Sequence, residues 1–150
     1  MSTDATPPAG RQLLPGIPAA HHGNGERILH VDDEPAVTTT LRRLLQKLGY
    51  RVESFNISFA AADRFRAAPH DFDLVLTDLM MPGMDGIELA RTIQSLRPGL
   101  PIVLHSAYSD RYSRTVIHSS GVREIMAKPA SLELIAATLR RALVPFSPNS

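Results

Sequence analysis

Leu74-Val75-Leu76-Thr77-Asp78-Leu79-Met80-Met81-Pro82-Gly83-Met84-Asp85-Gly86 is the stretch of sequence that decides the fold. Its first four residues form a short apolar run, which predicts a buried strand that ends at Asp78. The Pro-Gly pair predicts a loop, and Asp85 is placed to cap the helix that follows. Residues 87–96 then carry apolar side chains at helical spacing. The stretch is therefore a strand-loop-helix unit with a carboxylate at the end of its strand.

The same unit recurs on both sides of this stretch. Short apolar strands alternate with helices along the rest of the chain, as expected for a parallel sheet that is covered on both faces. We therefore predict a doubly wound α/β domain, in which ligands bind beyond the carboxyl ends of the strands. The further strands are predicted at 28–31, 51–55, 102–104 and 122–127, and the further helices at 35–48, 58–68, 110–119 and 132–143.

Composition excludes several classes of site. A length of 150 residues fits one domain. The sequence has no cysteine, which excludes disulfides, thiolate metal sites and cysteine nucleophiles. Its 16 basic and 15 acidic residues nearly balance, which argues against nucleic-acid binding. Because no apolar run is long enough to span a membrane and no signal peptide is evident, we expect a cytoplasmic protein that binds neither nucleic acid nor membrane.

The predicted domain covers residues 27–144. Residues 1–26 are rich in Pro, Gly and Ala and show no periodicity, which predicts a disordered N-terminal tail. Residues 145–150 are expected to form a short C-terminal tail.

Five polar side chains follow the ends of four predicted strands. Asp32 and Asp33 follow the first strand, Asp78 the third, Ser106 the fourth and Lys128 the fifth. In a parallel sheet these ends meet at one rim. Three carboxylates in one cleft repel one another and favour a bound cation, and oxygen ligands suit Mg²⁺. An ionised aspartate beside Mg²⁺, a hydroxyl and a lysine has the parts for phosphoryl transfer.

Each of these residues also has a structural interpretation when it is taken alone. Asp32 and Asp33 favour the start of a helix about as well as they favour a metal. Asp78 is also a common turn residue, Ser106 can cap a strand end, and an isolated Lys128 would be a solvated surface lysine. Since all five lie at strand ends, we interpret them together as one site.

Four motifs resemble the response regulator receiver family of two-component signalling. They are Ile28 to Pro35, Asp78 to Gly86, Ser106-Ala107 and Lys128-Pro129, and the likeness extends over residues 26–143. The resemblance implies a CheY-like sheet with strand order 2-1-3-4-5.

The resemblance also implies roles by position. Asp78 corresponds to the phosphoacceptor. Asp33 corresponds to a direct Mg²⁺ ligand, Asp32 to a ligand that acts through water, and the backbone carbonyl of Met80 to the third protein ligand. With Asp78, these residues form the implied metal site.

Two further positions correspond to groups that contact the phosphoryl group. Ser106 matches the switch hydroxyl, beside which the small Ala107 leaves room. Lys128 matches the phosphate-binding lysine, whose bond to the following proline is often cis in the family. Ile125 departs from the pattern, because the family usually has Tyr or Phe three residues before that lysine.

Two histidines lie in predicted strands near the rim. His30 stands where an aliphatic residue is usual, and we interpret it as a core histidine with a hydrogen-bond partner. His105 should point away from Ser106, because side chains alternate along a strand.

Three functions are compatible with these residues. The favoured one is a single-domain response regulator that accepts a phosphoryl group on Asp78 from a histidine kinase or a histidine phosphotransfer protein. A phosphatase with an aspartyl-phosphate intermediate is the second, although its D-x-D pattern after the first strand is missing here. A phosphate-blind binding module is the third, although such modules lose an acid or the lysine.

Output is expected through a downstream protein contact or through onward phosphorelay. The linker-like residues 23–27 also allow a receiver detached from a hybrid histidine kinase. With Ile125 in place of an aromatic ring, we expect phosphorylation to reorder residues 108–120, where the predicted helix has the weakest apolar stripe.

Overall fold

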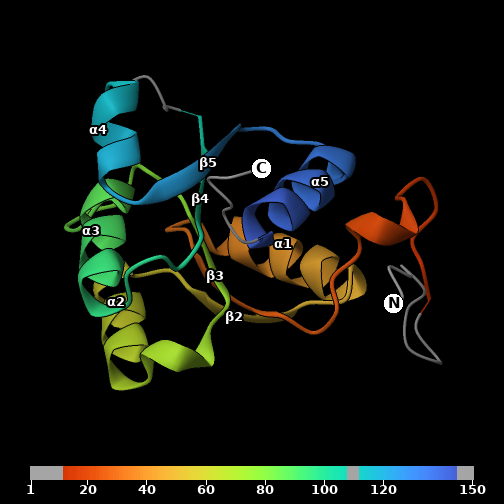
Figure 1. The fold of residues 1–150 in the computed structure, drawn as a ribbon, viewed down its shortest axis with the longest axis horizontal. Helices are drawn as coiled ribbons and strands as arrows, with labels where there is room; N and C mark the ends of the chain where they lie inside the picture. Colours follow the sequence, from red (N-terminus) through yellow and green to blue (C-terminus); the bar gives the residue numbers. More distant parts are fainter. Residues whose placement is uncertain (1–11, 108–111, 145–150) are drawn as a thin grey trace.

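The computed structural model describes residues 12–107 and 112–144 of the chain. Five strands alternate with five α-helices, and a short 3₁₀ helix precedes each of β1 and β3 (Figure 1). The elements are η1 (Ala19–His21), β1 (Arg27–Val31), α1 (Pro35–Lys47), β2 (Arg51–Phe55), α2 (Ser58–Ala67), η2 (Pro69–Asp71), β3 (Leu74–Thr77), α3 (Gly86–Leu96), β4 (Ile102–Ser106), α4 (Arg114–Ser119), β5 (Val122–Ala127) and α5 (Leu132–Leu143).

The sheet has the predicted topology. Its strand order is β2-β1-β3-β4-β5, and each neighbouring pair is parallel. The chain crosses from β2 over β1 to β3, so the strand order reverses between β1 and β3. This switch point is where a doubly wound sheet opens a crevice for ligands. The register places Val31 beside Thr77, so the residues that follow these two strands emerge side by side.

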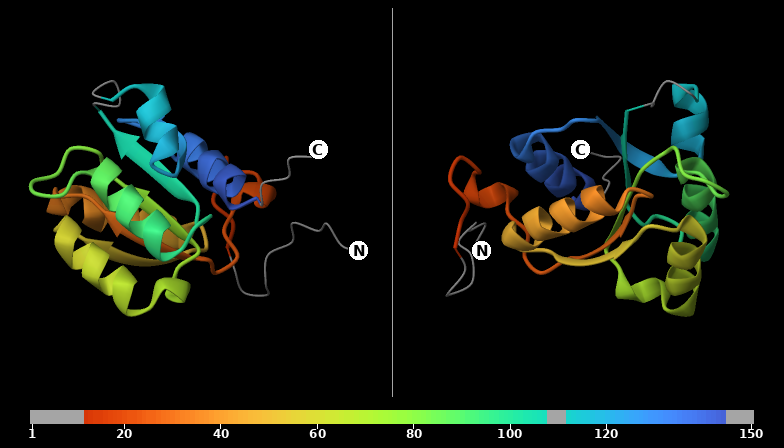
Figure 2. Two further views of the ribbon diagram at one scale, coloured as in Figure 1. Left: turned by 60° about the vertical axis from the view of Figure 1, so that its left-hand side comes forward. Right: turned by 180° about the vertical axis from the view of Figure 1, so that it is seen from behind.

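Helices cover both faces of the sheet, as predicted. In Figure 1, α2, α3 and α4 lie on one face, and α1 and α5 lie on the other; the right-hand view of Figure 2 shows the same two layers from behind. Each face has its own buried cluster. Phe65 and Ile93 belong to the cluster on the α2–α3–α4 side, and Leu45 and Leu139 belong to the cluster on the α1–α5 side. The three central strands, β1, β3 and β4, are almost fully buried between these clusters.

The boundaries of the helices follow local sequence signals. Asp85 caps α3 as predicted, because its side chain accepts from the Glu88 N–H while the Glu88 side chain accepts from the Asp85 N–H. α4 is shorter than the predicted 110–119. It begins at Arg114, because the side chain of Ser113 caps it by accepting from the Val116 N–H. Residues 110 and 111 lie outside the described part.

Residues 12–26 differ from the disordered tail expected for residues 1–26. Ile17 is buried in the cluster that α1 and α5 share. His22 closes the segment on itself, since one ring nitrogen accepts from the Leu14 N–H and the other donates to the Pro18 carbonyl. Glu26 pairs with Arg140 of α5 at 2.5 Å. These contacts hold residues 12–26 against the domain, although their sequence has no periodic apolar pattern. Residues 1–11 lie outside the described residues.

Truncation of Ile17 should therefore weaken the fold. We expect Ile17→Ala to lower the free energy of unfolding by about 2 kcal/mol, the low end for a buried isoleucine, because the site lies at the edge of the core. Leu13→Ala is the matched control, since Leu13 is 37% exposed, and it should change stability by less than about 0.5 kcal/mol. Urea unfolding measures both values. Equal effects of the two variants would contradict the packing of this segment.

Candidate functional site

Three carboxylates meet at the carboxyl ends of β1 and β3. Asp32 and Asp33 follow β1 directly, and Asp78 follows β3. Each offers an oxygen atom, and these atoms all lie within 4.8 Å of one another. Asp32 and Asp78 are buried. The structure thus brings together the three acids that the sequence predicted, in an arrangement that can hold a cation.

Lys128 reaches into the same cluster from the end of β5. Its Nζ atom lies 2.7 Å from Asp32 Oδ2 and 3.4 Å from Asp78 Oδ2. Burial alone would lower the pKa of this lysine, but the hydrogen bond to Asp32 and the attraction of Asp78 outweigh it and raise the pKa above its usual value. Lys128 therefore stays charged at neutral pH and is not the solvated surface lysine of the alternative interpretation.

Asp78 is held in place by the backbone of its own loop. The N–H of Leu79 donates to Asp78 Oδ1 at 2.7 Å, and the other carboxylate oxygen faces Lys128. Burial raises the pKa of Asp78, and the negative charge of Asp32 adds to this effect, whereas Lys128 opposes it. The group is a carboxylate whose negative charge is only partly compensated, which favours a bound cation or a reaction with an electrophile.

Gly86 allows α3 to approach the loop after Asp78. Its N–H donates to the Leu79 carbonyl at 2.8 Å, and a Cβ atom at this position would overlap the carbonyl oxygen of Asp78. Glycine is thus required here for close packing rather than for an unusual φ angle.

Gly86→Ala should therefore distort the site. We expect it to lower the free energy of unfolding by about 1–3 kcal/mol through overpacking. Ser95→Ala, on the exposed side of the same helix, is the control and should be close to neutral. Thermal unfolding of both variants tests this. A Gly86→Ala variant as stable as the wild type would contradict the close contact.

Ser106 and Met80 lie at a strand end and in the loop after Asp78, respectively. Ser106 ends β4 and is 1% exposed, and its carbonyl accepts from the Lys128 N–H at 3.1 Å. Met80 lies in the loop after Asp78 and is half-buried. The Lys128-Pro129 peptide bond is cis, as the resemblance implied.

Asn56 is a site residue that the sequence interpretation missed. Its side-chain amide donates to the Asp32 carbonyl at 2.8 Å and to Thr38 Oγ1 at 2.9 Å. It thereby ties the loop after β2 to the loop that carries the acids. Its place immediately after the second strand was the available signal, because polar residues directly after the other strands also lie at the rim.

The two strand histidines lie in different surroundings. His30 is buried in the core, as expected, and its Nδ1 has no hydrogen-bond partner among the described residues. Burial lowers the pKa of His30 to about 4, so its imidazole is neutral at pH 7. His105 faces the α1–α5 side of the sheet, where it lines a groove that also contains Ala107 and Lys128.

Tyr112 links the start of α4 to the loop after Asp78. Its hydroxyl donates to Asp85 Oδ2 at 2.6 Å, and Asp85 caps α3 at the end of the loop that begins at Asp78. α4 has six residues, of which only Ile117 is buried. A movement of the loop can therefore reach a weakly packed helix. Tyr108 lies outside the described residues.

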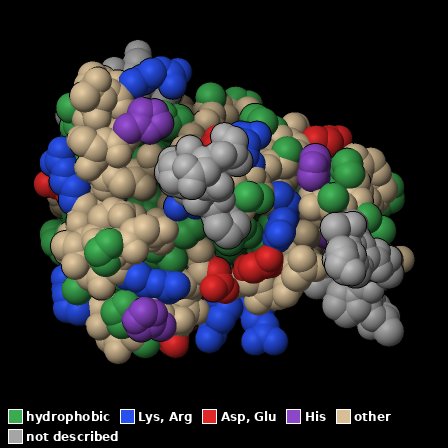
Figure 3. Space-filling view, viewed as in Figure 1, with side chains coloured by type: hydrophobic (Ala, Val, Ile, Leu, Met, Phe, Trp, Pro, Cys, Tyr) green, Lys and Arg blue, Asp and Glu red, His purple; other side chains and the backbone are tan. Residues whose placement is uncertain are grey.

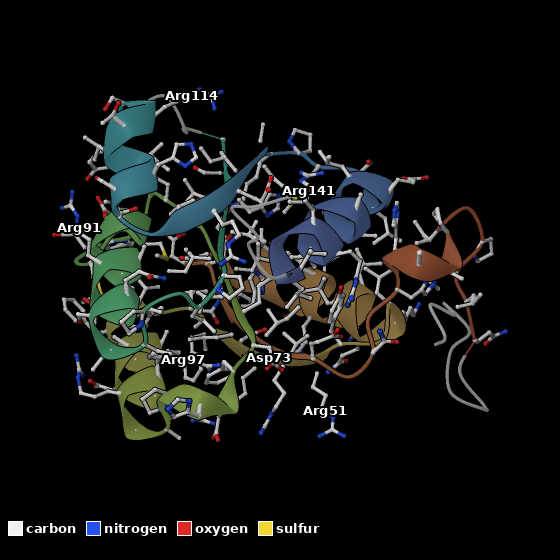
Figure 4. All side chains as sticks on the ribbon, in the orientation of Figure 1. Arg51, Asp73, Arg91, Arg97, Arg114 and Arg141 are labelled. Atoms are coloured by element: carbon white, nitrogen blue, oxygen red, sulfur yellow. The ribbon has the colours of Figure 1, made fainter. Side chains whose placement is uncertain are left out.

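Lys and Arg are spread over the face shown in Figure 3. Arg51, Arg91 and Arg114 come from β2, α3 and the start of α4, and they point away from one another (Figure 4). None of the described helices is long and apolar enough to cross a membrane.

Comparison with known proteins adds the family to this geometry. The sequence profile of the response regulator receiver domain matches residues 28–140. The chain belongs to the response regulator receiver family. In this receiver domain of two-component signalling, the acid cluster, Ser106 and Lys128 lie at the carboxyl ends of the strands.

Two relatives and one solved structure illustrate the likeness. The transcriptional regulatory protein ZraR of Klebsiella oxytoca is 36% identical over 116 residues, which cover 77% of this chain and 26% of ZraR. The response regulator MprA of Mycobacterium sp. (strain KMS) is 37% identical over 123 residues, which cover 82% of this chain and 53% of MprA. The receiver thus spans about a quarter to half of these relatives.

The solved structure is of the response regulator TrrA from Thermotoga maritima in complex with Mg²⁺ and BeF. It is 30% identical, with a TM-score of 0.71, and the match covers 79% of this chain and 99% of that one. The fold of this receiver is therefore shared with a protein that has been solved with a magnesium ion and a beryllium fluoride.

Proposed function

We propose that this receiver accepts one phosphoryl group on Asp78 in a Mg²⁺-dependent reaction and signals as a single domain. The donor is a phosphohistidine on a histidine kinase or a histidine phosphotransfer protein. The observation that carries the proposal is the contact of Lys128 Nζ with two acids, at 2.7 Å from Asp32 and 3.4 Å from Asp78, beside the third acid, Asp33.

The residues divide the reaction among them. An oxygen of the ionised Asp78 attacks the phosphorus atom, the P–N bond of the donor breaks, and the donor histidine keeps the electron pair of that bond and takes up a proton. A carboxylate needs no general base for this attack. Lys128 turns from Asp32 toward the transferred oxygens and neutralises their charge, and the Ser106 hydroxyl donates to one of them.

The three carboxylates fit a magnesium ion. Asp33, Asp78 and the backbone carbonyl of Met80 would bind it directly, and Asp32 would bind it through water. Mg²⁺ prefers hard oxygen ligands and usually binds only a few carboxylates of the protein, which agrees with this cluster. When bound, the ion supplies charge neutralisation for the phosphoryl oxygens.

Incubation with acetyl phosphate tests the proposal without a protein partner. Intact-mass measurement should show a single phosphoryl group in the presence of Mg²⁺ and none in excess EDTA. A phosphate-blind module would take up none in either case. An aspartyl-phosphate phosphatase would instead turn over a chromogenic phosphate ester repeatedly, and we expect no such turnover.

The donor is identified by a second experiment. Phosphotransfer profiling against purified histidine kinases and phosphotransfer proteins should give one donor that is much faster than the others. A donor kinase that has no receiver of its own, but whose relatives carry a fused receiver, would support the alternative that this domain derives from a hybrid histidine kinase.

Phosphorylation should change α4 more than β5. Ile125 is β-branched and half-buried, and it has no polar group with which to swing between core and water. Tyr112 instead connects the phosphoacceptor loop to α4 through Asp85. With Mg²⁺ and beryllofluoride, amide exchange should change in residues 112–120 and stay constant at Ile125. Changes confined to β5 would contradict this route.

A further inference from the structure

A groove between α1 and α5 lies beside the phosphoacceptor cleft. It has a volume of about 600 Å³, which falls within the range of small-molecule sites. Its walls are apolar side chains of both helices, among them Val37, Leu41 and Leu44 on α1 and Ile135 on α5. His105 forms part of its lining, and Lys128 stands at one end.

The groove is lined by apolar side chains from the core to the surface. Leu41 and Ile135 belong to the buried cluster on this side of the sheet, whereas Ala36 and Thr40 are exposed and Val37 is half-buried. This lining favours a largely apolar occupant.

His105 is a polar side chain in the lining of this groove, and it needs a hydrogen-bond partner. The residue is 8% exposed, and neither ring nitrogen has a hydrogen-bond partner among the described residues. A buried polar group without a partner is costly. A half-turn of the ring about its Cβ–Cγ bond exchanges ring nitrogens with ring carbons, and so can present a nitrogen to the groove if an occupant offers a partner.

The charge state of the groove favours a neutral occupant. Burial and the nearby Lys128 lower the pKa of His105, so its imidazole is neutral at pH 7. Lys128 is already paired with Asp32 and Asp78. A neutral imidazole has one donor and one acceptor nitrogen, and a hydroxyl group can pair with either of them.

We propose that the α1–α5 groove binds a small, neutral, largely apolar molecule that bears a hydroxyl group, which forms a hydrogen bond with His105. This site is separate from the acid cluster and does not depend on phosphoryl transfer. Because Lys128 lines one end, an occupant would lie next to the phosphoacceptor cleft without entering it.

The test uses 4-butylphenol as the probe and 4-butylanisole as a probe whose oxygen cannot donate. The complete chain, labelled with ¹⁵N in its histidines and ¹³C in its methyl groups, is titrated with each compound and followed by NMR. We expect saturable shifts of the His105 ring nitrogens and of the methyl groups of Val37, Leu44 and Ile135. The phenol should bind more tightly than the anisole.

Two variants assign the site. His105→Phe keeps a planar ring and should weaken the phenol by about three- to tenfold, the effect of one neutral hydrogen bond, while the anisole is unaffected. Val37→Trp should fill the groove and abolish binding of both probes. Thr39→Trp is the control, because Thr39 is exposed on the same helix and is not among the groove-lining residues.

Several results would overturn the proposal. Shifts that do not saturate, or that leave the His105 ring of the wild-type protein unchanged, would exclude the site even if the variants fold poorly. If His105→Phe weakens the binding of both probes equally, a hydrogen bond between the hydroxyl group and His105 does not contribute to binding. Shifts of the same groove methyls on raising the protein concentration alone would assign the groove to a second copy of the chain instead.

Discussion

Asp78→Asn should leave the domain unable to take up a phosphoryl group from acetyl phosphate and Mg²⁺. The amide keeps the acceptor for the Leu79 N–H but has no ionised oxygen with which to attack phosphorus. Intact-mass measurement should therefore show only the unmodified chain under conditions that label the wild type. Asp63→Asn is the matched control, because Asp63 is an exposed aspartate on α2 that pairs only with Arg66 among the described residues, and it should be labelled normally.

The same variant should fold well. Burial raises the pKa of Asp78, so the folded state holds a proton more tightly than the unfolded state, and ionisation of the group costs stability as the pH rises. Asp78→Asn should therefore be more stable than the metal-free wild type at pH 7. This gain should shrink as the pH falls through the raised pKa toward about 4, the usual value for aspartate. If Asp78→Asn is less stable than the metal-free wild type at pH 7, the negative charge of Asp78 does not destabilise the fold.

Asp33→Asn should remove the stabilisation of the domain by Mg²⁺. For the wild type, a Mg²⁺ concentration 100-fold above the Kd should raise the free energy of unfolding by about 2.7 kcal/mol, since only the folded state holds the three acids together. At the same concentration, Asp33→Asn should gain much less, because it lacks a direct ligand. Glu34→Gln is the matched control, since Glu34 is an adjacent exposed acid outside the acid cluster.

Without metal, the order of stability should reverse. Three carboxylates within 4.8 Å repel one another, so Asp33→Asn should melt at a higher temperature than the wild type in EDTA. Thermal unfolding with and without Mg²⁺ gives both comparisons. If Asp33→Asn lowers the stability of the metal-free domain instead, Asp33 serves the start of α1 rather than a metal.

The fold was predictable because the strands and most of the helices have a strong local signal. Short, largely apolar strands such as 74–77 must be buried on both faces, as they are between two layers of helices. The end of each strand then determines which residue lies at the carboxyl edge of the sheet. Asp78, Ser106 and Lys128 could be placed for that reason. The strand order itself came from the resemblance, because alternation of strands and helices does not determine which strands are neighbours.

Contacts that join distant parts of the chain could not be predicted in the same way. Ile17 is a single apolar residue in a segment without periodicity, and its burial depends on the surface that α1 and α5 create. The Tyr112–Asp85 bond spans two loops, and nothing in the local sequence specifies it. Asn56 is bound to the acid loop by its side chain alone. Such contacts are consequences of the fold rather than of the sequence around them.

Location of the modified residue in the wild-type chain tests the central claim most directly. After incubation with acetyl phosphate and Mg²⁺, borohydride reduces an aspartyl phosphate to homoserine, which peptide mass spectrometry can place in the sequence. We predict homoserine at position 78 and at no other aspartate, and none at all when EDTA replaces Mg²⁺. Homoserine at Asp32 or Asp33, or a labelled protein in which position 78 remains aspartate, would contradict the account.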